Sequence, residues 1–213
     1  MKVGVLISGR GSNLQSLINA QFTGHLSAEI VTVISNVPGA GGLKRATKAG
    51  ISSTVVNHKK FDRRNDFDET LNEALAFAGV DLICLAGFMC ILGDEFVNEW
   101  KDRLINIHPS LLPSFKGLNT HERALEAGVR FAGCTIHFVR AAMDEGPMIL
   151  QAVIPIQPDD TPQSLASRVL LLEHKTYPTA VRMIAEGRVR VKGNSVIIKD
   201  ANFTIDPMIN PTA

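Results

Sequence analysis

The N-terminal half of the chain alternates short apolar runs, rich in β-branched residues, with longer amphipathic stretches. The short runs predict strands, which we expect at residues 3–7, 30–35, 54–56, 82–86 and 104–107. The runs at 3–7, 82–86 and 104–107 are typical of buried strands. The longer stretches predict helices with one buried face, over residues 13–22, 42–49 and 65–78. Strands that alternate with helices form right-handed βαβ units on a parallel sheet. This half is therefore predicted to be an α/β structure.

The pattern changes after residue 121. Residues 134–140 and 148–156 are typical of two adjacent strands, and the turn at 144–147 between them predicts antiparallel pairing. A long helix is expected over 162–186, interrupted near Tyr177-Pro178, and a hairpin over 189–198 with Gly193-Asn194 at its centre. We therefore expect one domain over residues 1–213, in which helices flank a mostly parallel, twisted sheet and antiparallel strands lie toward the C-terminus.

Charge and cysteine content narrow the range of partners and cofactors. A net charge of +1 gives no electrostatic reason to expect nucleic acid or an anionic membrane. Cys84, Cys90 and Cys134 form no C-x-x-C pair and leave one odd thiol, which argues against a disulfide framework or a thiolate metal site. The chain shows no signal peptide and no apolar run of membrane-spanning length. We expect a cytoplasmic protein without a metal, and the sequence leaves a homodimer open.

A loop with two glycines, Ser-Gly-Arg-Gly-Ser-Asn at residues 8–13, follows the first predicted strand. Ligands of open α/β sheets bind at the carboxyl ends of strands, where a helix N-terminus offers free N–H groups to an anion. Leu14 replaces the third glycine of the dinucleotide fingerprint, and no Walker A lysine follows. A monophosphate, with Ser12 and Asn13 as donors, therefore fits better than NAD or ATP. The alternative, a tight turn with Ser12 or Asn13 as N-cap, is equally compatible with this loop.

Two polar residues interrupt the apolar strand that ends near residue 108. Strand alternation places Asn106 and His108 on the same side, and each alone is explained by a hydrogen-bonded core position or a loop cap. Together they suit acyl transfer, because an amide and a protonated imidazole can both donate to an oxyanion. Asp144, in the turn at 144–147, is the best candidate for the carboxylate that would favour the imidazolium. No serine or cysteine nucleophile is needed when the substrate is itself an amine.

The run Asn-Ile-His-Pro-Ser-Leu-Leu-Pro at residues 106–113, with Asp144 in an Asp-Glu-Gly-Pro turn, resembles the core of formyltetrahydrofolate-dependent transferases. The resemblance to the glycinamide ribonucleotide transformylase family, the phosphoribosylglycinamide formyltransferases, extends from residues 5–9 through 85–89 to Glu173-His174. Relatives that formylate methionyl-tRNA carry a C-terminal RNA-contacting domain, and formyltetrahydrofolate hydrolases carry an N-terminal regulatory one. We expect neither in 213 residues.

The resemblance implies a Rossmann-like formyltransferase fold, with a phosphate-binding N-terminal half and a folate-binding C-terminal half. It also implies a reaction in de novo purine biosynthesis. An enzyme of this family transfers a formyl group from 10-formyltetrahydrofolate, its co-substrate, to the amino group of N1-(5-phosphoribosyl)glycinamide. By the same resemblance Asn106, His108 and Asp144 would be catalytic.

The resemblance also assigns two binding regions. Gly11, Ser12 and Asn13 would hold the substrate phosphate, and Glu173 the ribose hydroxyls. The segment 140–144 would close over the pterin. The folate site as a whole would comprise Arg64, Met89, Cys90, Ile91, Leu92, Val97, Leu104, Asn106, Arg140, Ala141, Ala142, Met143 and Asp144.

Two positions depart from the family pattern. Cys90 stands where the family often has arginine, so Arg64 and its neighbour Arg63 would do more to hold the acidic folate tail. Leu170 stands where lysine or glutamine is usual, which removes a polar partner near the ribose phosphate. Two further histidines, His121 and His137, could be supporting groups of the site. A solvated or capping residue is the favoured interpretation of His121, whereas for His137, which could lie near His108, the two interpretations are about equal.

Two other functions are compatible with the sequence. One is formyl transfer to another small amine, such as a nucleotide sugar. The other is a non-catalytic nucleotide-binding or regulatory module on the same scaffold. A buried, paired Asn106, His108 and Asp144 facing an open cleft would disfavour the second, and an assay with 10-formyltetrahydrofolate would separate all three.

Overall fold

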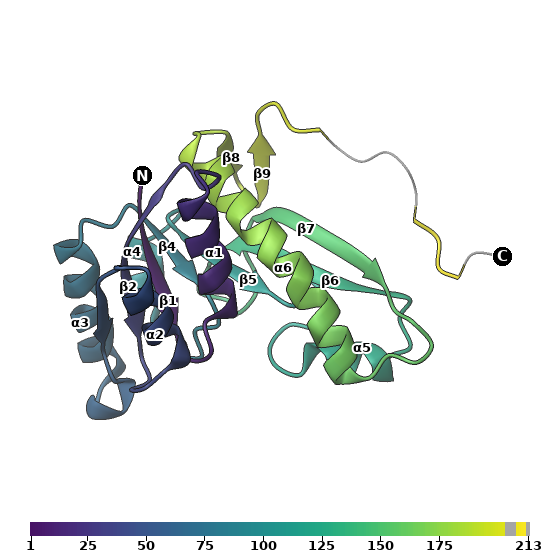
Figure 1. Ribbon diagram of the computed structural model, residues 1–213, viewed down its shortest axis with the longest axis horizontal. Coiled ribbons are helices and arrows are strands. Elements are labelled where there is room, and N and C mark those ends of the chain that lie inside the picture. The colour runs from purple at the N-terminus through teal and green to yellow at the C-terminus, as the bar shows by residue number, and fades with distance from the viewer. Residues whose placement is uncertain (203–207, 212–213) are drawn as a thin grey trace.

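The computed structural model describes residues 1–202 and 208–211. Its centre is a seven-stranded sheet of order β3-β2-β1-β4-β5-β6-β7 (Figure 1). The parallel strands are β1 (Lys2–Ile7), β2 (Glu29–Ser35), β3 (Ser53–Val55), β4 (Leu82–Leu85) and β5 (Leu104–His108). The antiparallel strands are β6 (Phe131–Phe138) and β7 (Met148–Pro155). The predicted mostly parallel sheet with antiparallel strands toward the C-terminus is confirmed.

Helices cover both faces of this sheet (Figure 1). Their bounds are α1 (Ser12–Phe22), α2 (Gly41–Lys48), α3 (Arg64–Phe77), α4 (Asp94–Glu99), α5 (Thr120–Glu126) and α6 (Pro162–Ala185). The remaining elements are the 3-10 turn η1 (His58–Lys60) and the predicted terminal hairpin, formed by β8 (Val189–Lys192) and β9 (Ser195–Ile198). None of the helices that the structure describes is long and apolar enough to cross a membrane.

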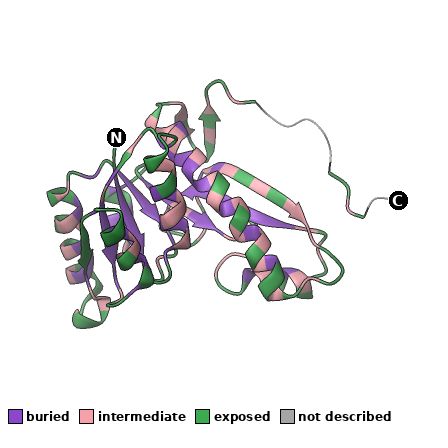
Figure 2. Cartoon of the chain, viewed as in Figure 1, coloured by how far each residue is buried: buried purple, intermediate pink, exposed green. Residues whose placement is uncertain are grey.

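The alternation of side chains along β1 divides the core into two apolar clusters on opposite faces of the sheet. Val3, Val5 and Ile7 pack with residues of α1 and α6, whereas Leu6 packs with residues of α3 and α4. All of these β1 side chains are completely buried. Figure 2 shows the same pattern, with buried strands enclosed between helices whose outer faces are exposed. Burial on both faces explains why central strands such as β1 and β4 are nearly continuous apolar runs.

The predicted interruption of the last long helix is wrong, because α6 continues through Pro178. A proline inside a helix lacks the N–H that would bond to the carbonyl four residues earlier, here that of His174. Packing compensates at this point of α6. Tyr177 is completely buried, and its hydroxyl donates to the Leu85 carbonyl at 2.9 Å. The short helices α4 and α5 were not predicted, since neither is long enough to show helical periodicity.

Candidate active site

A cavity of about 690 Å³ opens over β4, β5 and β6. It is bounded by the loops that follow β4 and β5, by the start of α5, and by the segment after β6. Its wall is mostly apolar, but a polar group converges on it, consisting of Asn106, His108, His121, His137 and Asp144. The carboxyl ends of parallel strands are where α/β sheets bind ligands, and the volume suits a small molecule.

His108 and Asp144 form a buried pair at the base of this cavity. His108 Nδ1 lies 3.4 Å from Asp144 Oδ1, and the two side chains are only 8% and 10% exposed. The other ring nitrogen, Nε2, lies 3.1 Å from the carbonyl oxygen of Phe115. Since a carboxylate and a carbonyl can only accept, the surroundings of His108 suit an imidazole that carries hydrogen on both nitrogens.

Asn106 lies on the same strand as His108 and opposite His137 of β6. The Asn106 amide nitrogen is 3.4 Å from His137 Nε2, and the other ring nitrogen of His137 is 3.0 Å from the Phe138 carbonyl. Burial lowers the pKa of His137, which favours the neutral ring. A neutral ring that donates from Nδ1 to Phe138 accepts at Nε2, so His137 orients the Asn106 amide and leaves its second hydrogen for a ligand.

The loop between β5 and α5 contacts both His108 and Asp144. Its Gly117 N–H donates to Asp144 Oδ2 at 2.8 Å, while the Phe115 carbonyl meets His108. Phe115 and Asp144 both have left-handed backbones, with φ of 55° and 53°. Such angles are uncommon outside glycine, and here they aim a carbonyl and a carboxylate at one imidazole.

Two segments form much of the cavity wall. The loop after β4 contributes Met89, Cys90, Ile91 and Leu92, and α4 adds Val97. This loop is fixed at both ends, because the Met89 N–H donates to Ser8 Oγ at 2.6 Å and the Gly93 N–H donates to Asp68 Oδ2 at 2.8 Å. The segment after β6 contributes Arg140, Ala141, Met143 and Asp144.

The glycine loop lies at the same edge of the sheet, next to the loop after β4. Gly11 has a φ of 72° and is the N-cap of α1, so neither Ser12 nor Asn13 is the N-cap. A Cβ on Gly11 would lie 2.6 Å from the Cα of Gly42, which explains why the loop needs glycine there. The first turn of α1 directs N–H groups that have no helical acceptor toward this edge.

Asn13 and Glu173 join the glycine loop to α6. The Asn13 amide donates to Glu173 Oε2 at 2.6 Å, and both side chains are more than nine-tenths buried. Burial raises the pKa of Glu173, and the hydrogen bond from Asn13 offsets part of that rise. Asn13 Oδ1 is buried without a hydrogen-bond partner among the described residues. The structure thus brings Glu173 next to the glycine loop that holds Gly11, Ser12 and Asn13.

The whole-chain comparison decides the family. A model of the family described as formyl transferase matches residues 1–181. The chain belongs to the formyl transferase family. Its relatives include the phosphoribosylglycinamide formyltransferase of Haemophilus influenzae, which is 43% identical over 91% of each chain. They also include the trifunctional purine biosynthetic protein adenosine-3 of Bos taurus, 49% identical over 92% of this chain. The chain spans only 19% of the length of that larger relative.

Two solved structures share the fold of this chain. Glycinamide ribonucleotide transformylase 1 from Symbiobacterium toebii superposes with a TM-score of 0.92 at 44% identity, covering 94% of both chains. A formyltetrahydrofolate deformylase from Burkholderia mallei superposes with a TM-score of 0.85 at 29% identity, covering 92% of this chain and 69% of the deformylase. The Rossmann-like formyltransferase fold expected from the sequence is therefore confirmed.

Not every residue that the sequence assigns to the folate site lines the cavity of this formyl transferase. Leu104 is completely buried in the apolar cluster below it. Arg64 is exposed at the start of α3, close enough to Cys90 to lower its thiol pKa, although burial raises that pKa more. Ala142 is also absent from the lining, while its neighbours Ala141 and Met143 contribute to it.

For His121 the favoured interpretation, a solvated or capping residue, is wrong. His121 is half-buried in α5 and lines the cavity. Burial and the proximity of His108 lower the pKa of His121. The flanking residues Gly117, Leu118, Asn119 and Thr120 also line the cavity without having been predicted. Their loop has no periodic pattern, so only the fold brings it to the site.

The two departures from the family pattern have different surroundings. Cys90 is half-buried within the cavity wall, beside Asp68 and Arg64. Leu170 is half-buried on α6, one helical turn before Glu173. In the described part of the chain, no group of three or more histidine, cysteine or acidic side chains is arranged to hold a metal ion.

Proposed function

We propose that this protein transfers the formyl group of 10-formyltetrahydrofolate to the amino group of N1-(5-phosphoribosyl)glycinamide, a step of purine biosynthesis. The observation that carries this proposal is the buried His108–Asp144 pair beside Asn106, at the base of a large apolar cavity. The relatives that bear the name of this activity support the choice of substrate. The adjoining glycine loop offers a place for the substrate phosphate.

Asn106 and His108 act on the oxygen of the formyl group. As the substrate amine attacks the formyl carbon, that oxygen gains negative charge, and both side chains can donate to it. Asp144 Oδ1 lies 3.4 Å from His108 Nδ1, where it orients the ring and balances positive charge that develops on it during the reaction. The Phe115 carbonyl now accepts from His108 Nε2, so the formyl oxygen must displace this contact to be bound there.

The reaction also needs a proton transfer, because the amine loses a proton while the folate nitrogen gains one. The new bond joins the amine nitrogen to the formyl carbon, and the bond from that carbon to the folate nitrogen breaks. We assign the transfer to His108 together with ordered water, since His108 is the titratable group of the trio that can both donate and accept. The apolar wall of the cavity limits access of other water to the formyl group.

Each half of the protein then binds one substrate. The N–H groups of the α1 N-terminus, with Ser12 and Asn13, hold the phosphate, and Glu173 accepts from the ribose hydroxyls. The loop after β4 and the segment 140–144 enclose the pterin, while Arg64 at the rim meets the acidic folate tail. We further propose that residues 1–213 act as one domain in the cytoplasm, where the three free cysteines stay reduced. A homodimer is compatible with this function.

A turnover assay with 10-formyltetrahydrofolate and a panel of amines tests the proposal. The panel comprises phosphoribosylglycinamide, an amino-sugar nucleotide and free glycinamide. We expect phosphoribosylglycinamide to be formylated at a rate far above the other two, because only it carries both the phosphate and the ribose that the loop and Glu173 bind. Preference for the amino-sugar nucleotide, or no loss of the formyl group with any amine, would contradict the proposal.

A further inference from the structure

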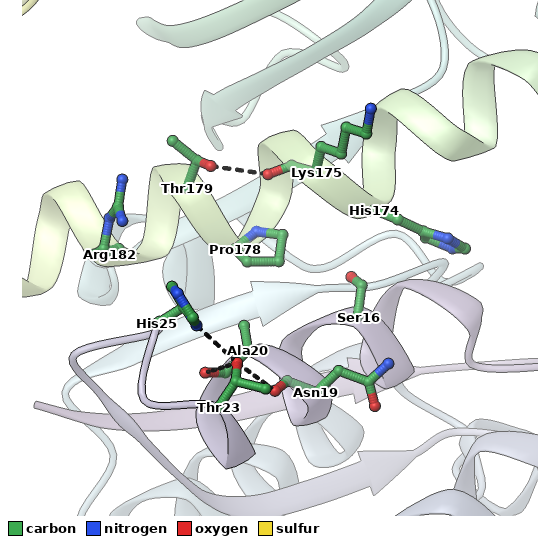
Figure 3. A pocket seen from close by; sticks show the side chains of 10 residues that line it. All are labelled: Ser16, Asn19, Ala20, Thr23, His25, His174, Lys175, Pro178, Thr179 and Arg182. Atoms are coloured by element: carbon green, nitrogen blue, oxygen red, sulfur yellow. Dashed lines mark hydrogen bonds between the residues drawn. The ribbon is translucent and has the colours of Figure 1, made fainter.

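Ser8, the residue after β1, has a side chain that connects distant segments of the chain. Its hydroxyl oxygen accepts from the Met89 N–H at 2.6 Å and lies 2.5 Å from Asn36 Oδ1. Hydroxyls at helices commonly bond locally instead. Figure 3 shows two of them at the groove between α1 and α6, where Thr23 and Thr179 each donate to a carbonyl four residues earlier. Ser8, by contrast, bridges separations of 28 and 81 residues along the sequence.

The order of the strands brings these three segments together. Strands β2, β1 and β4 are neighbours in the sheet, and Asn36, Ser8 and Met89 each follow the carboxyl end of one of them. The Ser8 N–H donates to the Gly87 carbonyl at 3.1 Å, and Gly87 turns the chain with a φ of 72°. This turn returns the Met89 N–H to the Ser8 hydroxyl. Ser8 therefore holds the start of the loop after β4 through both its main chain and its side chain.

The hydrogen bonds around Ser8 have a fixed direction. A serine hydroxyl has one hydrogen, and the Met89 N–H occupies a lone pair of its oxygen, so the hydrogen is available for Asn36. A separation of 2.5 Å suits an O–H···O bond and is shorter than N–H···O bonds usually are, so the amide oxygen of Asn36 faces Ser8. Asn36 accepts the hydrogen and thereby leaves the oxygen of Ser8 free to accept from the loop.

Asn36 is itself held in a buried position. It is 1% exposed, and its own N–H donates to the Ile7 carbonyl at 3.3 Å. His58 Nδ1 lies 3.2 Å from the Asn36 amide nitrogen and 3.0 Å from the Asn36 carbonyl oxygen. The imidazole ring therefore makes one of these two hydrogen bonds in either tautomer. These contacts hold Asn36 where its amide oxygen can reach Ser8.

We propose that Ser8 and Asn36 are positioning residues for folate binding. Neither side chain lines the large cavity, but the loop that Ser8 holds contributes residues 88–92 to its wall. Asp68 fixes the far end of this loop through Gly93, so Ser8 and Asn36 provide the support at the near end. Without that support the wall should bind the folate less tightly, while the bond-making step should be little affected. The inference rests on the proposed function, because it takes a folate as the ligand of this wall.

Calorimetric titration with tetrahydrofolate, which carries the pterin but no formyl group, measures this role at equilibrium. Ser8→Ala removes the acceptor of the Met89 N–H, so the affinity should fall by about three- to tenfold, as for the loss of one hydrogen bond. Asn36→Leu leaves the Ser8 hydroxyl without its acceptor and should cause a smaller fall. Asn36→Asp should retain most of the affinity, because its carboxylate still accepts from Ser8. In turnover assays of the first two variants, KM for 10-formyltetrahydrofolate should rise with little change in kcat.

Ser35→Ala is the matched control. Ser35 is completely buried, and its hydroxyl donates to the Val37 carbonyl at 2.8 Å and accepts from the Val37 N–H at 3.1 Å. The substitution thus removes a hydroxyl with two hydrogen bonds next to Asn36 in the sequence, and neither bond reaches the loop after β4. It should leave the affinity for tetrahydrofolate unchanged. An equal loss of affinity in Ser8→Ala and Ser35→Ala would overturn the inference, as would unchanged affinity in Ser8→Ala or Asn36→Leu.

Hydrogen exchange of the Met89 amide, followed by NMR without ligand, tests the Ser8 contact apart from the proposed function. Exchange should be faster in Ser8→Ala and Asn36→Leu than in the wild-type protein and in Ser35→Ala. An unchanged exchange rate in Ser8→Ala would overturn the inference. Failure of the wild-type protein to bind tetrahydrofolate is a different result, which would contradict the proposed function itself.

Discussion

The two halves of the site are built in different ways. The glycine loop of the N-terminal half offers mainly backbone N–H groups, and its shape depends on close contact between Gly11 and Gly42. The cavity of the C-terminal half depends on side chains from the loop after β4, from β5 and from the segment after β6. Asn106 and His108 of β5 lie beside Asp144 of the segment after β6. A backbone site is altered chiefly by changes that move the chain, whereas a side-chain site is altered by removing one group.

The largest effect on turnover is expected from removing the side chain of His108 or of Asp144. His108→Ala and Asp144→Ala should each lower kcat by about 10²–10⁴-fold, the usual contribution of a positioned acid–base group. Steady-state kinetics gives the value, and circular dichroism with thermal unfolding checks that the fold is intact. A folded variant with near-wild-type turnover would remove this pair from the mechanism.

Asn106→Ala should have the next largest effect. It removes one donor to the oxyanion, so we expect kcat to fall by about 10²-fold with a smaller change in KM. His137→Gln is an informative companion. His137 only orients the Asn106 amide, at 3.4 Å, so this substitution should lower kcat less than Asn106→Ala does. If loss of His137 lowers kcat more than loss of Asn106, the assignment of the oxyanion donor is wrong.

A substitution in the glycine loop tests the half of the site that binds through backbone N–H groups. Gly11→Ala places a Cβ 2.6 Å from the Gly42 backbone at a φ of 72°, so we expect a loss of about 1–3 kcal/mol in the free energy of unfolding. KM for phosphoribosylglycinamide should rise with it, while kcat at saturation changes less. Gly9→Ala is the control, since a Cβ there meets no atom within 4 Å. An equal free energy of unfolding for the two variants, measured by denaturant unfolding, would show that the contact between Gly11 and Gly42 does not limit the residue at position 11.

A smaller effect on kinetics is expected at Asp68, which supports the cavity of the C-terminal half. Its carboxylate accepts from the Gly93 N–H and fixes the loop that carries Met89 and Leu92 into the cavity. Asp68→Ala should raise KM for 10-formyltetrahydrofolate several-fold, with little change in kcat, and Asp68→Asn should retain most of the affinity because it keeps an acceptor oxygen. An effect on kcat alone would contradict this positioning role.

The smallest effect is expected on stability at Glu173. Burial raises the pKa of Glu173 above its ordinary value of 4.5, so the fold disfavours the charged form. That penalty is absent below pH 4.5, where both folded and unfolded chains are protonated, and is complete above the raised pKa. Glu173→Gln should therefore raise the unfolding temperature at pH 7, and the gain should shrink as the pH falls. A gain that is independent of pH would contradict this cause.

Much of the fold was predictable because burial on both faces leaves a direct mark on the sequence. Strands β1 and β4 are largely apolar runs, which suit a strand covered on both faces. The short edge strand β3 is exposed and lacks this mark. The path of α6 through Pro178 was not predictable, because it depends on Tyr177 reaching the Leu85 carbonyl, which lies far away in the sequence. Local preference gave the wrong answer where a tertiary contact outweighed it.

The site likewise contains residues that the local sequence reveals and residues that only tertiary contacts place. Asn106, His108 and Asp144 were recognisable as polar residues in conspicuous surroundings, and the glycine loop by its place after β1. His121 and the Phe115 carbonyl were not, because their approach to His108 depends on left-handed backbone angles in the loop before α5. No local pattern encodes the position of that loop. The positions of Leu104 and Arg64 outside the cavity lining are likewise a result of packing rather than of sequence.

The most direct test of the central claim follows the formyl carbon itself. The protein is mixed with phosphoribosylglycinamide and 10-formyltetrahydrofolate that carries ¹³C in the formyl group, and the label is traced by NMR. We predict that the label appears in the formyl amide of the glycinamide product, and that His108→Ala does not produce it at a comparable rate. Label released as free formate, as in a deformylase, would contradict the account, as would label that stays on the folate.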